Sequence, residues 1–202
     1  MIGGVSAIIV GVISLIWDTI ILFLLLSCFY DAFREFHRFY SSIRVLSLPL
    51  SLVLLSLFMV VGFGYLKGAK KFDKKVGETC WLIIIVYFSA ECTMRAMEYL
   101  LPLFGVEPYG TLPYILLRML IPCVMIIYGF YSIKYFTGEE VDIFGYIGSI
   151  LIIISGFPSF MWSIIGYVSL SLAIILWVMI SYPWSMGLIL IGLGLVRQAA
   201  RL

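Results

Sequence analysis

The sequence predicts an all-α membrane protein, a polytopic bundle of seven transmembrane helices, with six as the alternative. Hydrophobic residues make up 63% of the 202 residues and charged residues only 12%, against roughly 45–50% and about 25% in soluble domains. The apolar residues form runs of about 20, the length that crosses a bilayer. A soluble fold of this size could not cover so much apolar surface, so we expect one integral membrane domain over residues 1–202.

Seven apolar stretches, separated by glycines, prolines or charged residues, define the predicted spans. They are residues 5–27, 45–66, 80–101, 112–136, 141–157, 159–180 and 184–197. The last two boundaries rest on the segments Gly156–Ser159 and Ser181–Trp184, which each contain a proline. Helix length and the positions of these prolines therefore favour seven spans.

A short loop after the second span carries five lysines, Lys67, Lys70, Lys71, Lys74 and Lys75. Cytoplasmic loops of membrane proteins are enriched in Lys and Arg, so we expect this loop in the cytoplasm of a multi-pass cell-membrane protein, where it could also contact anionic lipid headgroups. With six spans, eight of the thirteen basic residues share its side: the five lysines, Lys134 and the two C-terminal arginines. With seven spans, one side of the membrane holds six basic residues and the other holds seven. The charge distribution therefore favours six spans.

A repeated segment of the sequence, here called the echo, also bears on the number of spans. The segment GFGYLK at Gly62–Lys67 resembles GFYSIK at Gly129–Lys134 and GLGLVR at Gly192–Arg197. A period near 65 residues would fit three helical hairpins, and it would place all three basic ends on one side. The alternative is convergence, because many apolar helices end with small residues and a cation that reaches the interface.

The third span carries charges in its second half. Glu91, Arg95 and Glu98 are spaced four and three residues apart and so share one helix face. A charge inside a bilayer costs at least a few kcal/mol unless it faces protein or water. With Asp18 in the first span and Arg118 in the fourth, we expect an intramembrane polar network in which Arg95 pairs with both glutamates and Arg118 pairs with Asp18.

The fourth span contains Pro122, four residues after Arg118. A proline ring displaces the carbonyl four residues before it, so the sequence predicts a helix kink with a freed carbonyl at Arg118.

An amphipathic stretch at residues 28–44 follows the first span, and it predicts either an interface-lying helix or an extension of that span. Within it, YDAFREFHR at Tyr30–Arg38 resembles small archaeal multi-span membrane proteins, some of which resemble the membrane input modules of archaeal sensors. Because the chain ends at Leu202, we expect no soluble output domain. The absence of Asn and the single Gln are a composition typical of thermophile proteins.

Catalytic signatures are absent from the sequence, so we expect no enzyme and no cofactor. There is no GxSxG, HExxH or Walker A motif, and the single histidine excludes a bis-histidine haem. The four cysteines have no CxxC spacing, which favours small buried hydrophobes over a metal site. A net charge of +2 gives no reason to expect a nucleic-acid partner.

Two functional hypotheses remain. The first is a non-catalytic bundle that binds a ligand, another membrane subunit or a second copy of itself, with its embedded charges as an internal ion-pair network. The second is a small transporter or ion pathway in which those charges line a wet cavity near Pro122. In either case the lipid bilayer is the surrounding partner.

Overall fold

The computed structural model describes the backbone of residues 1–28, 33–69, 74–108, 111–138, 141–165 and 170–201, and their side chains except those of residues 24–48, 68–69, 164–165 and 170–174. The described residues form six helices and no strand. The helices are α1 (Ile2–Cys28), α2 (Phe33–Ala69), α3 (Lys74–Leu103), α4 (Leu112–Phe136), α5 (Ile143–Ile165) and α6 (Leu170–Ala200). Each contains a stretch long and apolar enough to cross a bilayer, so the chain is a multi-pass membrane protein.

The prediction of seven spans was wrong, and the alternative of six fits the structure. Pro158 lies inside α5 and Pro183 lies inside α6, so neither separates two helices. The last two helices are separated instead between residues 165 and 170. A proline inside a membrane helix is tolerated because neighbouring helices and side chains satisfy the freed backbone groups, whereas an irregular break would expose backbone to lipid.

The amphipathic stretch also differs from its prediction. Residues 33–44 are the first part of α2, which continues without interruption through the second span. The stretch is therefore an extension of the second span rather than of the first. Residues 29–32 lie outside the described part of the chain.

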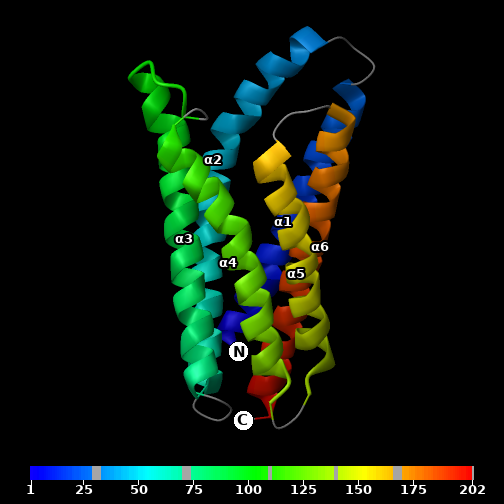
Figure 1. Cartoon of the computed structure of the whole chain (residues 1–202). Helices are drawn as coiled ribbons and strands as arrows, with labels where there is room; N and C mark the ends of the chain where they lie inside the picture. Colours follow the sequence, from blue (N-terminus) through cyan, green and yellow to red (C-terminus); the bar gives the residue numbers. More distant parts are fainter. Residues whose placement is uncertain (29–32, 70–73, 109–110, 139–140, 166–169, 202) are drawn as a thin grey trace.

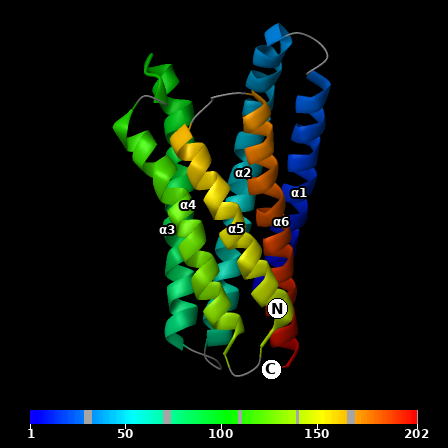
Figure 2. The same ribbon diagram turned by 45° about the vertical axis from the view of Figure 1, so that its right-hand side comes forward.

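Consecutive helices pack side by side, and α6 packs against α1, so the six helices close a ring in chain order. Helix α2 also touches α6 across this ring. Both termini lie at the end of the bundle that holds the α2–α3 connection (Figures 1 and 2). Because Lys67, Lys74 and Lys75 lie there, we call it the lysine end, and we call the other the distal end.

Glycines bring the helix backbones into direct contact around the ring. A Cβ atom on Gly4 of α1 would lie 2.7 Å from the carbonyl oxygen of Gly192 in α6, and one on Gly148 of α5 would lie 2.6 Å from that of Gly187. Lipid tails are as apolar as helix surfaces, so membrane helices associate through this kind of close packing. The glycine contacts therefore fix which face of each helix meets its neighbour.

The three echoed segments occupy equivalent places in the ring. Gly62 of α2 packs on Trp81 of α3, Gly129 of α4 packs on Ile153 of α5, and Gly192 of α6 packs on α1. Each glycine thus contacts the next helix around the ring. Positions four and one before the glycine and three after it are also buried in every segment. They are Phe58, Val61 and Tyr65; Met125, Tyr128 and Ser132; and Leu188, Ile191 and Leu195.

Six spans place the two ends of the chain on the same face of the membrane. We expect reporter fusions at Met1 and Leu202 to report the same compartment as a reporter in the lysine loop. Paired green fluorescent protein and alkaline phosphatase fusions measure this directly. Termini in opposite compartments would contradict the six-helix ring.

The glycine contacts predict position-specific sensitivity in α5. Replacing Gly148 with Val pushes a side chain into the backbone of α6, so we expect a loss of about 1–3 kcal/mol in stability. Ile154→Ala on the same helix serves as the control, because Ile154 is 45% exposed on the lipid side. Melting in detergent, followed by size-exclusion chromatography, should show a clear decrease for the first variant and little change for the second.

Candidate functional site

A partly open cavity of about 130 Å³ lies among four of the helices, enough for roughly four water molecules at about 30 Å³ each. Four helices line it, and α3 contributes the charges. The lining residues are Val10 and Ser14 of α1; Ser51, Leu54, Leu55 and Phe58 of α2; Tyr87, Glu91 and Arg95 of α3; and Trp184 of α6. Since Glu91 is 17 positions after Lys74, about 25 Å along a helix, the cavity reaches into the distal half of the bundle.

Arg95 is held mainly by Glu98, and it forms the wall of the cavity on the side of the distal end. Its Nη1 donates to Oε2 of Glu98 at 3.3 Å, and the hydroxyl of Tyr114 in α4 donates to the other oxygen at 2.8 Å. The Nε atom lies 3.6 Å from Oε2 of Glu91. Both ion pairs expected for Arg95 are therefore present, and Tyr114 ties them to the next helix.

Glu91 has less of its hydrogen-bonding capacity satisfied than Glu98. Its contact with Arg95 is an ion pair too long for a hydrogen bond, and no hydrogen bond to its carboxylate is found within the described residues. The Nε atom that faces it is buried and likewise makes no hydrogen bond. A carboxylate with 13% of its side chain exposed needs water or a ligand group as a partner. The cavity is where that partner fits.

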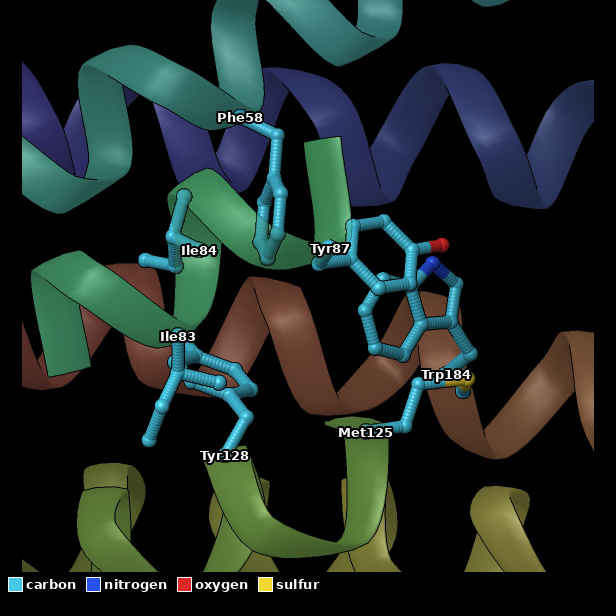
Figure 3. Close-up of a pocket in the computed structure, with 7 residues that line it drawn as sticks. All are labelled: Phe58, Ile83, Ile84, Tyr87, Met125, Tyr128 and Trp184. Atoms are coloured by element: carbon cyan, nitrogen blue, oxygen red, sulfur yellow. The ribbon is translucent and has the colours of Figure 1, made fainter. Parts of the chain in front are cut away.

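Three aromatic rings, those of Phe58, Tyr87 and Trp184, line the cavity. Together with the neighbouring ring of Tyr128 they are here called the aromatic barrier (Figure 3). Tyr87 and Trp184 stack with their centroids 5.6 Å apart, and Phe58 meets Tyr87 edge-on at 5.4 Å. The space among these rings and their aliphatic neighbours is too narrow for a water molecule. The barrier therefore separates the cavity from the lysine end.

Below the barrier lies a hydrogen-bonded group that we call the tyrosine–serine cluster: Tyr65, Tyr128, Ser132 and Ser149. The hydroxyl of Tyr65 shares hydrogen bonds with Tyr128 at 3.0 Å and with Ser132 at 2.6 Å. Ser149 of α5 donates to Ser132 at 2.8 Å. All four residues are buried, so the cluster joins α2, α4 and α5 across the ring. It fills the interior between the aromatic barrier and the lysine end.

Asp18 does not belong to the same network, and its predicted pairing with Arg118 was wrong. Its carboxylate accepts from Ser185 of α6 at 3.4 Å, and Ser181 is a second hydroxyl partner. The neighbouring Thr19 shares a 3.2 Å hydrogen bond with Tyr182. Because α1 and α6 are adjacent in the ring, this polar group joins them, whereas Arg118 belongs to α4.

Arg118 instead joins α4 to α5. Its guanidinium donates to the carbonyl of Trp162 at 3.2 Å, and its own carbonyl accepts from Ser163 at 2.9 Å. This is the carbonyl that Pro122 was expected to free, so the hydroxyl of Ser163 supplies the partner lost from the helix. The bend at Pro122 itself stays a prediction.

The lysines predicted to determine topology lie away from the cavity. Lys67, Lys74 and Lys75 are exposed at the lysine end, and Lys70 and Lys71 lie outside the described residues. Sequence reasoning missed Ser14, Ser51, Tyr87 and Trp184 as cavity residues. Tyr87 could have been identified from its spacing, since it lies four residues before Glu91 on the same helix face.

Removing the charge at position 95 tests the ion pairs. In Arg95→Gln, two partly buried carboxylates lose their cation, so we expect a loss of about 3–5 kcal/mol in stability. Adding Glu98→Gln removes one of these carboxylates, so the double variant should recover part of that loss. Thermal melting in detergent compares the three proteins. A double variant no more stable than the single one would contradict the pairing.

The part of the chain that the structure describes contains no group of three or more His, Cys, Asp or Glu side chains able to hold a metal ion. Comparisons with protein-family models, with curated proteins and with solved structures found no match to this chain.

Proposed function

We propose that this chain is a non-catalytic membrane protein that binds a small ligand in the cavity bounded by α1, α2, α3 and α6. The observation that carries the proposal is the placement of Glu91 and Arg95 in the wall of a space that holds a few water molecules. If the charges served packing alone, hydrogen-bonded neighbours would be expected to fill the space around them.

The lining of the cavity also supports ligand binding. The volume of about 130 Å³ lies below the usual range for drug-sized ligand pockets, so the cavity suits only a small ligand. Two serines, two charged residues and three aromatic residues are combined with aliphatic side chains in the wall. A few polar groups in an apolar enclosure are the usual composition of a small-molecule site.

In the proposed orientation the lysine end faces the cytoplasm and ligand enters from the distal side. The basic residues at the lysine end support this orientation through the charge bias of cytoplasmic loops. Arg95, at the distal edge of the cavity, keeps 35% of its side chain exposed. The aromatic barrier and the tyrosine–serine cluster lie on the cytoplasmic side of the ligand.

The exposed apolar side chains favour lipid over a protein partner as the outer contact. Large hydrophobic residues are exposed on all six helices rather than on one face. Such an even distribution is what a bilayer requires of a spanning bundle. The exposed apolar residues therefore mark no single face of the bundle as the contact for a partner subunit or a second copy of the chain.

Transport is the second candidate function, and the aromatic barrier favours it. A site accessible from one side and closed toward the other by a few side chains is also one state of an alternating-access carrier. Asp18 and Arg118 would then contribute to packing rather than to the pathway, because neither is among the residues that line the cavity.

Accessibility of introduced cysteines tests the proposal. In a background without the four native cysteines, we expect Ser51→Cys to react with a membrane-impermeant thiol reagent added from the distal side only. Ser149→Cys, beyond the barrier, serves as the matched control and should react from neither side. Mass spectrometry of intact protein measures the labelling.

Each alternative result has a distinct meaning. A Ser51→Cys variant that is inert from both sides would refute a ligand cavity. If Ser149→Cys becomes reactive from the lysine end during turnover of a substrate, the transport candidate replaces simple binding.

A further inference from the structure

The order of groups along α3 gives the cavity a chemical polarity. Tyr87, Glu91 and Arg95 are successive residues on one helix face, each about one turn from the next. The aromatic floor therefore comes first, then a carboxylate, and then a guanidinium at the open edge. A ligand that reaches the floor meets aromatic rings and a carboxylate together.

The guanidinium is already engaged, but the carboxylate is not saturated. Arg95 donates to Glu98 and forms a second ion pair with Glu91, while Glu98 is also bound by Tyr114. Two carboxyl groups thus share one guanidinium, and the hydrogen bond of Arg95 goes to Glu98. Of these two carboxyl groups, that of Glu91 lines the cavity, and within the described residues it accepts no hydrogen bond.

The aromatic residues of the cavity also favour a cation. The face of an aromatic ring carries negative potential and attracts an ammonium group within about 6 Å of its centroid. The stacked pair of Tyr87 and Trp184, with Phe58 beside it, lines the cavity directly below Glu91. Figure 3 shows these three side chains converging from α2, α3 and α6.

We infer that the cavity selects a small organic cation, an ammonium group with an apolar body, held between the carboxylate of Glu91 and the aromatic faces of Tyr87 and Trp184. This inference rests on the proposed function and specifies its ligand class. Arg95 acts at the edge of the site as a positioning residue, because its bond to Glu98 keeps the guanidinium away from the floor.

Three probes of nearly equal shape and different charge test the inference. They are choline, its neutral carbon isostere 3,3-dimethylbutan-1-ol, and the anion 3,3-dimethylbutanoate. The full chain in an uncharged maltoside detergent is titrated with each, and saturation-transfer NMR gives the dissociation constants. We expect choline to bind at least tenfold more tightly than the neutral alcohol, and the anion to bind most weakly.

Substitutions then locate the selectivity. Glu91→Gln should reduce choline affinity at least tenfold, to that of the neutral alcohol, without changing the affinity for the alcohol. Glu78→Gln is the matched control, because it makes the same charge change on the same helix, at the exposed lysine end, and should leave all three affinities unchanged. If Glu91→Gln does not yield monodisperse protein, Tyr87→Leu keeps the carboxylate and should weaken choline binding severalfold.

Several results would overturn the inference: equal affinity for choline and the alcohol, a preference for the anion, no binding of any probe, or choline affinity unaltered by both cavity substitutions. These results are separate from a failure of the proposed function, which is shown by an inert cysteine at position 51. If the cysteine at position 51 reacts and the three probes bind with equal affinity, the cavity remains a binding site but does not select cations.

Discussion

Backbone contact at glycines is the interaction on which the shape of this bundle depends. In lipid there is no hydrophobic gain from bringing two apolar helices together, so the faces that allow the closest approach determine the arrangement. Gly3 and Gly64 join α1 to α2, and Gly4 and Gly192 join α1 to α6, with all four near the lysine end. Toward the distal end, α3 and α4 stand apart from α1 and α6 in both views (Figures 1 and 2). The cavity lies on the side where these contacts no longer hold the ring together.

The charges fit this asymmetry. Near the lysine end, the buried carboxylate of Asp142 accepts from the backbone N–H of Gly145. The tyrosine–serine cluster fills the interior of that half with hydroxyl groups. In the looser half, Glu98 is satisfied by Arg95 and Tyr114, while Glu91 borders space that water or a ligand can occupy. The same helix therefore carries the hydrogen-bonded pair of Arg95 and Glu98 and, nearly two turns before Glu98, a carboxyl group that borders the cavity.

Sequence reasoning predicted what depends on a single helix and failed on what depends on how helices rotate toward each other. The pairs of Arg95 follow from spacing along α3, and the freed carbonyl of Arg118 follows from the chemistry of Pro122. The contact of Asp18 with Ser185 could not be derived, because an apolar helix has no polar face that indicates its orientation. Counting spans failed at Pro158 and Pro183 for a related reason: a proline breaks helices in water more readily than in lipid. The repeated glycine segments, and the charge bias that went with them, were better evidence for six helices.

The three hairpins of the repeat differ in the side chains that they place at equivalent positions. Residues at the equivalent inner positions of α2, α4 and α6 are buried in all three hairpins, yet they are Phe58, Met125 and Leu188, so the ring is equivalent in packing and not in chemistry. Within the described residues, the charged side chains that line the cavity, Glu91 and Arg95, both belong to α3. The glycine contacts pack each hairpin against its neighbour in the same way. The side chains that differ among the hairpins then determine where the interior holds a cavity and charged groups. A site built in this way can change its ligand chemistry through α3 while the glycine contacts that hold the ring stay unaltered.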